Sequence, residues 1–345
     1  MMEKFKTLLA AEADDYELQP LYRYCEIETA GWYVNETVLS EDEQIEKLQG
    51  KDIFITSYDK VTRRVIENTA LKLIVCTRAT PVNVDTEAAK EHAIPVVYTP
   101  GRNSDSTAEF AVALLLSIAR RIPFAYDAIR SRAIVTDDAE RPGPLKKDVT
   151  WGMVKGVRPY SYFKGTQLKN KTVGVVGYGS IGRRVAKILS GFGMYVLVCD
   201  PYVSRLEIDS PGFRKVDFDT LLRESDFITC HLKVTDETRG MFSAEAFDKM
   251  KPTAFFINDC RGAIVDESAL IEALRRRKIA GAALDVYEYE PLYAGHPFVN
   301  EDFDNLVITP HIAGAAREII ANHTQMFVDD IISFAEGRPL VHVVR

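Results

Sequence analysis

The sequence has few cysteines and no long hydrophobic run. Its five cysteines form no Cys-x-x-Cys pair, and three of them end short apolar runs. Such cysteines behave as small hydrophobic residues on buried strands, so we expect free thiols in a reducing cytoplasm. The longest apolar run, at residues 110–119, is much shorter than a membrane span. The apolar stretch at residues 7–11 is also too small for the core of a secretory signal. We therefore expect no membrane partner.

An excess of positive charge and a repeated unit are also missing. The chain has 43 Lys and Arg against 50 Asp and Glu, a net charge of −7. This balance argues against nucleic acid as the partner. No segment recurs at a fixed period, which argues against a solenoid or propeller. A length of 345 residues is too great for one ordinary domain and suits two.

Short apolar runs alternate with helical patterns along the chain. We expect helices at 41–48, 61–69, 85–92, 267–277 and 314–336. Alternation of this kind is typical of parallel α/β domains. The predicted strands are residues 21–31, 51–56, 72–76, 94–98, 226–230, 254–257, 279–284 and 306–308.

A glycine-rich motif at Thr172–Gly182 gives the first indication of function. A β-branched run precedes Gly177, Gly179 and Gly182, which have G-x-G-x-x-G spacing, and a helical pattern follows directly. This order of strand, turn and helix makes the motif specific for a dinucleotide. The first glycine permits the turn, the second lets the backbone approach a pyrophosphate, and the third lets the helix pack on the strand. The free N–H groups at the helix start favour phosphate.

An acidic residue stands at the distance that such a motif requires. Asp200 ends the apolar run 195–199, about 20 residues beyond the glycines. Its carboxylate would accept hydrogen bonds from a ribose 2′-hydroxyl and repel a 2′-phosphate. The sequence therefore predicts NAD rather than NADP, although Arg205 is close enough in the sequence to relax the preference.

Polar stretches follow the predicted strands of the second half of the chain. In open parallel sheets, ligands bind outside the carboxyl ends of the strands, so this placement predicts a site. The stretches are residues 231–238, 258–262, 285–291 and 309–314.

From about Lys72 to about Gly314 the chain resembles the NAD-dependent D-isomer-specific 2-hydroxyacid dehydrogenases. The first fifty or so residues carry little of this resemblance. The motifs that carry it are G-Y-G-S-I-G at 177–182, H-L-K-V-T-D-E-T at 231–238, I-N-D-C-R-G-A-I-V-D-E at 257–267, A-L-D-V-Y-E-Y-E-P at 283–291 and T-P-H-I-A-G at 309–314, with P-V-N-V-D at 81–85 and T-P-G-R-N at 99–103.

The resemblance implies three catalytic residues. Arg261 would bind the substrate carboxylate and polarise the C2 oxygen, His311 would be the general acid and base, and Glu290 would orient His311. These residue types suit the chemistry, because Arg binds carboxylates through two parallel bonds and His titrates near neutral pH. Glu288 is an alternative to Glu290, but the Glu-Pro step at 290–291 matches the family.

The resemblance also implies the cofactor contacts. Asp285 would bond the nicotinamide carboxamide, Ser180 and Ile181 would lie under the pyrophosphate, and His231 is expected on the cofactor side or in a structural role. The full set of expected cofactor-binding residues is Gly177, Gly179, Ser180, Ile181, Gly182, Asp200, His231, Asp259, Cys260, Asp285 and Gly314. No metal site is expected.

The loop at residues 77–81 departs from the family pattern. Family members usually have glycines here, whose N–H groups bind the substrate carboxylate, whereas this chain has Arg78, Ala79 and Thr80. Ala79 and Thr80 still offer N–H groups, and Arg78 would meet a phosphate, a second carboxylate or a surface acid. We expect these residues and Arg261 to bind the substrate, a 2-hydroxy or 2-keto acid, including phosphorylated or sugar acids such as 3-phosphoglycerate.

The family implies two Rossmann-like α/β domains. The substrate domain would comprise residues 1–104 and 315–345, and the NAD-binding domain residues 105–314, with the active site in a cleft and a homodimer built on the cofactor domains. The irregular stretch at 131–164 is an oligomer arm, a lid or a variable loop.

The alternative function is an NAD-sensing regulatory protein on the same scaffold, similar to the C-terminal-binding corepressors. The intact set of Arg261, Glu290 and His311 favours the enzyme.

Overall fold

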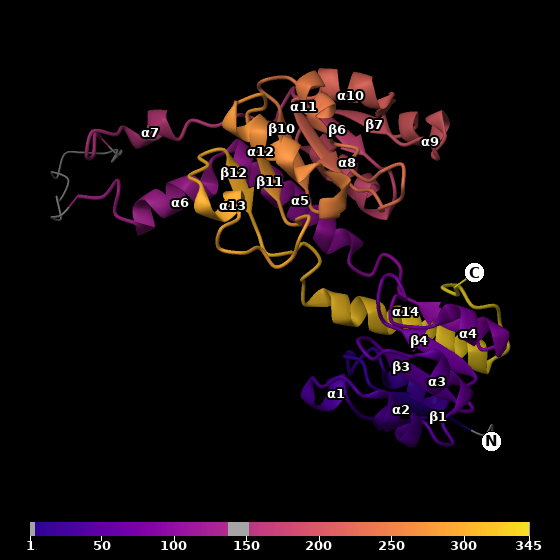
Figure 1. Ribbon diagram of the computed structural model, residues 1–345. Helices are drawn as coiled ribbons and strands as arrows, with labels where there is room; N and C mark the ends of the chain where they lie inside the picture. Colours follow the sequence, from indigo (N-terminus) through magenta and orange to yellow (C-terminus); the bar gives the residue numbers. More distant parts are fainter. Residues whose placement is uncertain (1–3, 137–151, 345) are drawn as a thin grey trace, which may run out of the picture. The chain divides into compact units, whose positions relative to one another are not determined.

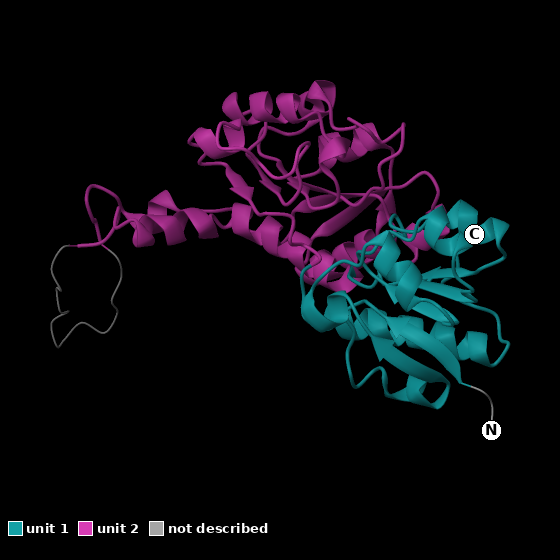
Figure 2. Ribbon diagram, turned by 60° about the horizontal axis from the view of Figure 1, so that its bottom comes forward, with its two compact units in different colours: residues 1–103, 315–345 teal, residues 104–314 magenta. Residues whose placement is uncertain are grey.

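The computed structural model describes residues 4–136 and 152–344 of the chain (Figure 1). These residues form two compact units, one within the bounds 1–103 and 315–345 and the other within the bounds 104–314 (Figure 2). We call them unit 1 and unit 2. Each contains a parallel sheet with helices on both faces, so the predicted fold class of two Rossmann-like α/β units is confirmed.

The described residues of unit 1 form a five-stranded parallel sheet in the order β2-β1-β3-β4-β5. Side chains alternate between its faces, as the pleat of a strand requires. Leu8 and Phe54 pack in one core while Leu9 and Ile53 pack in the other. The strands are β1 (Phe5–Leu9), β2 (Cys25–Thr29), β3 (Ile53–Thr56), β4 (Leu73–Cys76) and β5 (Val96–Tyr98).

Helices cover both faces of this sheet. The first core takes side chains from α2 (Glu41–Lys47), α3 (Arg63–Glu67) and α4 (Thr86–Glu91). The second core takes them from the 3-10 helix η1 (Gln19–Arg23) and from α14 (Glu318–Ala335). The short helix α1 (Trp32–Asn35) follows β2. Helix α14 thus completes a core whose strands lie near the other end of the chain.

The described residues of unit 2 form a seven-stranded parallel sheet in the order β12-β11-β10-β9-β6-β7-β8. The strand order reverses between β6 and β9, which makes this the topological switch point of the sheet. The strands are β6 (Thr172–Val176), β7 (Tyr195–Cys199), β8 (Arg214–Lys215), β9 (Phe227–Cys230), β10 (Phe255–Asn258), β11 (Gly281–Leu284) and β12 (Leu306–Ile308).

Two sets of helices bury the faces of this sheet. Helices α5 (Ser104–Ala119) and α8 (Ser180–Gly191) pack on one face. Helices α10 (Phe218–Glu224), α11 (Ala244–Lys249) and α12 (Glu267–Arg275) pack on the other. Neighbouring residues such as Phe256 and Ile257 belong to opposite cores. The remaining elements of unit 2 are α6 (Ile122–Arg130), α7 (Pro159–Tyr162), α9 (Arg205–Asp209), η2 (Gly262–Ile264) and α13 (Pro297–Asn300).

The N-terminal region differs most from the predicted elements. The predicted strand at 21–31 shortens to β2, because Pro20 stands at the start of a 3-10 helix that takes up the preceding residues. Residues 5–9 form β1, which lies between β2 and β3 in the sheet. They include part of the apolar stretch at 7–11 that is too short for a secretory signal. Of the irregular stretch at 131–164, residues 131–136 and 152–164 are described and contain α7, and the rest lies outside the described residues.

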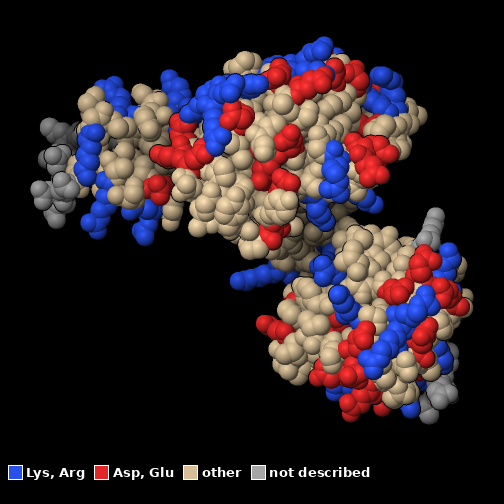
Figure 3. Space-filling view, viewed as in Figure 1, with Lys and Arg blue, Asp and Glu red and all other residues tan. Residues whose placement is uncertain are grey.

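Charged side chains of both signs are mixed on the surface. On the face drawn in Figure 3, the Lys and Arg side chains are interspersed with Asp and Glu in each unit. Many are paired at the surface, as in Arg63 with Glu91 and Arg275 with Glu272. Among the described residues, no helix has the length and apolar character needed to cross a membrane.

A buried histidine connects α14 to the sheet edge of unit 1. His323 is only 3% exposed. Its Nε2 lies 2.8 Å from the carbonyl oxygen of Glu12, and its Nδ1 lies 2.7 Å from Nη1 of Arg102. Since a carbonyl accepts and a guanidinium donates, the neutral ring carries its proton on Nε2. Burial, reinforced by the Arg102 charge, lowers the pKa of His323 to about 4.

The burial of His323 predicts loss of stability in mild acid. Its pKa in the folded state lies below the ordinary value of 6.5, so the unfolded chain binds more protons between about pH 6.5 and pH 4. Stability should therefore fall as the pH falls through this window. Between neutral pH and about pH 5, His323 should lower the free energy of unfolding by about 2 kcal/mol.

Urea unfolding at the two pH values tests this expectation. His323→Gln should be less stable than the wild type at neutral pH but should lose less stability on acidification. His92→Gln, at an exposed position of the same unit, is the control and should retain the wild-type pH dependence. Equal losses in the wild type and His323→Gln would contradict the assignment.

Candidate active site

The predicted site residues of unit 2 follow the carboxyl ends of five parallel strands. The glycine turn follows β6, His231 follows β9, Arg261 follows β10, Asp285 follows β11 and His311 follows β12. All five strands are neighbours in one parallel sheet, so their carboxyl ends meet at one edge. The turn and His231 flank the switch point, where open sheets bind their ligands.

The glycines of the turn are required by close backbone contacts. Gly177 has a φ of +90°, and a Cβ placed on it would lie 2.5 Å from the carbonyl oxygen of His231. A Cβ on Gly182 would lie 2.0 Å from the carbonyl oxygen of Gly177, so helix α8 packs directly on the turn. Gly179 faces open space instead, because, its chain neighbours aside, no atom of the described residues lies within 4 Å of the position that a Cβ would occupy.

The first turn of α8 has the properties of a phosphate site. The N–H groups of Ser180 and Ile181 meet no acceptor within the part of the chain that the structure describes. The Ser180 hydroxyl is 2.8 Å from the hydroxyl of Ser104, at the start of α5. Free N–H groups beside the open face of Gly179 fit a pyrophosphate.

Asp200 is tied to this turn through the backbone. Its Oδ2 accepts a hydrogen bond of 2.8 Å from the N–H of Tyr178, and its Oδ1 accepts one of 2.9 Å from the N–H of Tyr202. These bonds hold the carboxylate at the end of β7 beside the glycines. This geometry fits a residue that accepts hydrogen bonds from a ribose.

His231, Asp259 and Cys260 lie below the surface. The side chain of His231 is 1% exposed and that of Asp259 is 0% exposed, with Nδ1 and Oδ1 3.5 Å apart. Burial lowers the pKa of His231 to about 3 and raises that of Asp259. The Sγ atoms of Cys260 and Cys230 lie 3.6 Å apart in the same layer. The predicted cofactor contacts of these three residues stay predictions.

Arg261 projects from a tightly fixed backbone. The side chain of Asn258 donates a 3.0 Å hydrogen bond to the carbonyl oxygen of Arg261. Gly262 admits no side chain, since a Cβ would lie 1.9 Å from the carbonyl oxygen of Tyr287. The exposed guanidinium donates to the Cys260 carbonyl oxygen at 2.5 Å and has no carboxylate partner among the described residues. Its charge is therefore available to an anionic ligand.

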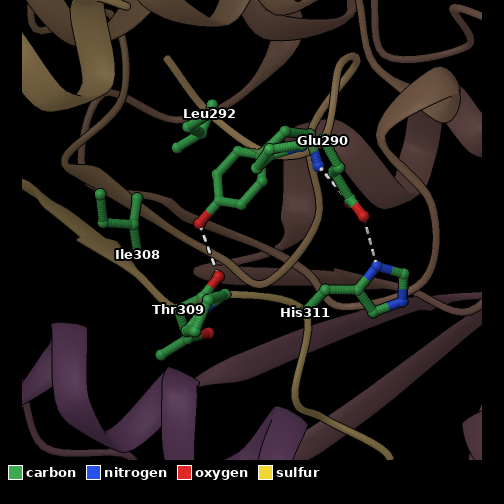
Figure 4. A pocket seen from close by; sticks show the side chains of 8 residues that line it. Glu290, Leu292, Ile308, Thr309 and His311 are labelled. Atoms are coloured by element: carbon green, nitrogen blue, oxygen red, sulfur yellow. Dashed lines mark hydrogen bonds and ion pairs between the residues drawn. The ribbon is translucent and has the colours of Figure 1, made fainter. Parts of the chain in front are cut away.

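His311 and Glu290 form a hydrogen-bonded pair at the same edge (Figure 4). Nδ1 of His311 lies 2.6 Å from Oε2 of Glu290, so Nδ1 carries the proton that the carboxylate accepts. The other oxygen of Glu290 accepts a 3.1 Å bond from the N–H of Tyr287. This arrangement leaves Nε2 of the half-exposed imidazole free for a ligand.

The pair lines a cavity of about 640 Å³. The Tyr287 hydroxyl donates to the carbonyl oxygen of Thr309 at 2.7 Å and so joins the two segments that carry Glu290 and His311. The lining residues are Tyr287, Glu290, Pro291, Leu292, Ile308, Thr309, Pro310 and His311. The volume is in the range of a small-molecule pocket.

Asp285 has a role that its motif did not reveal. It is fully buried, and its Oδ1 accepts hydrogen bonds from the Thr309 hydroxyl at 2.6 Å and the Ile312 N–H at 2.9 Å. Its Oδ2 accepts one of 2.7 Å from the Ala313 N–H. The carboxylate thus fixes the loop that holds His311, whose φ of 56° lies in the left-handed region. The predicted bond to a nicotinamide carboxamide stays a prediction.

The neighbouring acids occupy other positions. Glu288 does not bond His311, and its N–H donates to Glu267 at 3.1 Å. Glu267 also bonds the buried His296 at 2.9 Å, a structural pair for which the sequence offered no signal. Gly314 is the last residue of unit 2, and Arg78, Ala79 and Thr80 follow β4 in unit 1.

Comparison with known proteins now decides the family. A family model described as D-isomer specific 2-hydroxyacid dehydrogenase, NAD binding domain, matches residues 112–313. The chain belongs to this family. The resemblance found in the sequence is therefore confirmed, and NAD, as predicted, is the cofactor of the family's binding domain. Members of this family are oxidoreductases that act on a CH–OH group.

Individual relatives in the family differ in their names and lengths. The chain is 39% identical to a D-3-phosphoglycerate dehydrogenase of Archaeoglobus fulgidus over 310 residues, which cover 89% of this chain and 54% of that protein. It is also 39% identical to a glyoxylate reductase of Thermococcus litoralis over 300 residues, 85% of this chain and 83% of that protein. It therefore spans about half the length of the phosphoglycerate dehydrogenase.

A solved structure supports the same fold. The TT0316 protein from Thermus thermophilus superposes with a TM-score of 0.77 and 31% identity, over 99% of this chain and 100% of that chain. The likeness covers the residues of both units.

The glycine turn predicts opposite effects for two similar substitutions. Gly182→Ala should destabilise the protein by about 1–3 kcal/mol, because its Cβ would press into the Gly177 carbonyl. Gly179→Ala should leave stability nearly unchanged and weaken NAD binding by roughly tenfold or more, because its Cβ enters the space that a pyrophosphate needs.

Thermal unfolding and NAD titration by calorimetry separate the two effects. Gly191→Ala, in the same helix where the added Cβ meets no clash, is the control; it should leave NAD affinity unchanged and raise stability by at most about 1 kcal/mol. Undiminished NAD affinity in Gly179→Ala would show that the cofactor does not lie against this glycine.

Proposed function

We propose that the chain is an NAD-dependent D-2-hydroxyacid dehydrogenase that transfers hydride reversibly between the nicotinamide and C2 of a 2-hydroxy or 2-keto acid. The observation that carries the proposal is the 2.6 Å contact between His311 and Glu290, at the strand edge that also holds Arg261, which has no carboxylate partner among the described residues. A binding protein would have no need of an oriented acid–base pair.

Arg261 binds and orients the substrate. Its guanidinium presents parallel donors to the carboxylate, and a further N–H polarises the C2 oxygen. The fixed backbone around Gly262 holds the base of the side chain in place. The nicotinamide supplies the hydride acceptor or donor.

His311 handles the proton of the C2 oxygen. In the oxidation of a 2-hydroxy acid, Nε2 takes the hydroxyl proton as hydride leaves C2, and in the reverse direction it returns that proton. Glu290 keeps the other proton on Nδ1 and stabilises the imidazolium that forms. The bond from the Tyr287 N–H holds Glu290 in the orientation that this role needs.

The substrate belongs to the class of small 2-hydroxy and 2-keto acids. The relatives' names include both phosphoglycerate dehydrogenase and glyoxylate reductase, so they do not select one acid. We propose that Ala79 and Thr80 offer N–H groups to the substrate and that Arg78 favours an acid with a second anionic group, such as 3-phosphoglycerate. Unit 1 would then be the substrate domain and unit 2 the NAD-binding domain, in a cytoplasmic enzyme.

Loss of the acid–base group should abolish most turnover. His311→Ala should lower kcat by roughly 10²–10⁴-fold, the contribution of a positioned proton-transfer group. Glu290→Gln should lower kcat by a smaller factor, because an amide oxygen accepts the bond without stabilising the imidazolium. Steady-state kinetics of NADH oxidation with glyoxylate, hydroxypyruvate, pyruvate and phosphohydroxypyruvate provide the measurement.

The matched control is Glu288→Gln, which removes a neighbouring acid that does not bond His311. It should preserve the wild-type rate. Near-normal turnover in His311→Ala would refute the catalytic assignment. NAD binding by the wild type without turnover of any keto acid would favour the NAD-sensing regulatory function instead.

We also propose a homodimer that uses helix α6. This helix buries none of its residues within the described structure. Ile122, Tyr126 and Ile129 are 55%, 66% and 45% exposed and share one helical face. An apolar face of this kind is typical of an interface, and the resemblance implies a homodimer on the cofactor domain.

Sedimentation velocity tests the dimer. Ile129→Asp should shift the protein from dimer to monomer, because a carboxylate at this face would be buried without a partner. Val34→Asp, an equivalent change at an exposed residue of α1, should leave the mass unchanged. A monomeric wild type would overturn the proposal.

A further inference from the structure

The carboxyl edge of the unit 1 sheet gathers charged and aromatic residues. Tyr58 follows β3, Arg78 follows β4 and Arg102 follows β5, and these three strands are neighbours in the sheet. The last two segments are joined, because the N–H of Thr99 donates to the Arg78 carbonyl oxygen at 3.1 Å and the N–H of Arg102 donates to the Thr99 carbonyl oxygen at 3.4 Å. Ligands of open parallel sheets bind at this edge.

Arg102 is held by neutral groups instead of an acid. Its Nη1 donates to Nδ1 of His323 at 2.7 Å, and Nε2 of His323 donates to the carbonyl oxygen of Glu12 at 2.8 Å. This chain of bonds fixes the direction of the guanidinium and uses one of its five N–H groups. The remaining N–H groups have no carboxylate partner within the described residues.

The surroundings of Arg102 favour an anion. Arg78 stacks over the ring of Tyr58 at 5.5 Å and also has no carboxylate partner among the described residues. Burial, with the Arg78 charge as a further contribution, lowers the pKa of Arg102. The N–H groups of Ala79 and Thr80, beside Arg78, meet no acceptor in the described structure. Two cations and two free N–H groups at one edge leave a local charge that a bound anion would neutralise.

We propose that Arg102, positioned by His323, binds the second anionic group of a dianionic 2-hydroxy or 2-keto acid. This inference rests on the proposed dehydrogenase function and extends it to the substrate class. The ligand chemistry is that of a phosphate or a second carboxylate, both of which match the planar fork of a guanidinium. His323 is a positioning residue, because it acts through Arg102.

A matched pair of keto acids isolates this contact. Hydroxypyruvate and its 3-phosphate differ only in the second anionic group. Arg102→Gln should lower kcat/KM for phosphohydroxypyruvate by roughly 10- to 100-fold, the range of a charged hydrogen bond. The kcat/KM for hydroxypyruvate should change by less than about threefold if the residue makes no other contact. Arg102→Lys should restore part of the selectivity, since it keeps the charge but loses the fork.

His323→Gln distinguishes positioning from a purely structural role. It should raise KM for the dianionic acid more than KM for hydroxypyruvate and leave kcat nearly unchanged. Arg64→Gln, which removes an exposed arginine paired with Glu41 and Asp42 in the same unit, is the charge control. It should leave KM for the dianionic acid and KM for hydroxypyruvate unchanged. Equal losses for both keto acids in Arg102→Gln would overturn the proposal.

A second comparison separates phosphate from carboxylate. 2-Oxoglutarate carries a carboxylate in place of the phosphate. If the wild type prefers 2-oxoglutarate and Arg102→Gln loses this preference, the site is assigned to dicarboxylic acids. Loss confined to phosphohydroxypyruvate would assign it to phosphorylated acids.

Direct binding keeps this test independent of turnover. Should the wild type reduce no keto acid, the proposed function fails, and the anion site is then tested with inorganic phosphate and malonate by calorimetry. Binding that Arg102→Gln weakens tenfold or more, and that Arg64→Gln preserves, would support the site. Absence of binding, or equal binding by Arg102→Gln, would overturn it.

Discussion

The buried carboxylate of Asp285 is the constraint on which the candidate active site depends. Three hydrogen bonds from Thr309, Ile312 and Ala313 converge on it from one loop. A buried anion needs such partners, so any displacement of the loop would leave a charge unsatisfied at a cost of several kcal/mol. His311 lies within this loop with a left-handed backbone, a conformation that an isolated residue would avoid. The carboxylate therefore holds the imidazole where Glu290 can meet it.

The three acidic residues in this part of unit 2 have different hydrogen-bond partners. Asp285 accepts bonds from the loop that carries His311, and Glu290 bonds the imidazole of His311. Glu267 bonds His296 and the N–H of Glu288. Each carboxylate accepts bonds from different partners, although all three lie in or near one short region of the chain. Exchanging two of them in the sequence would preserve composition and charge but would lose the acid–base pair.

Sequence patterns predicted the strands of unit 2 well, because strands buried on both faces of a parallel sheet consist of consecutive apolar residues. The run at 195–199 is the strand β7, and residues 306–308 are β12. The family resemblance predicted the pairing of Glu290 with His311, because the Glu-Pro step at 290–291 matches the family and so favoured Glu290 over Glu288. What the sequence patterns missed depends on distant partners. No local pattern shows that His323 bonds Arg102, or that β1 lies inside a sheet, since both depend on residues far apart in the chain.

Helix α14 has a consequence for the order in which the chain acquires structure. Its Phe327 and Ile331 fill the second core of unit 1, against Leu9 and Leu73 of strands that are made before it. Unit 2, in contrast, consists of one continuous segment, residues 104–314. Domains usually fold from the N-terminus as they leave the ribosome. Here the strands β1 to β5 have an apolar sheet face uncovered until the residues of α14 have been made. The later unit can complete its core first, so the N-terminal strands are the part of the nascent chain most in need of protection from aggregation.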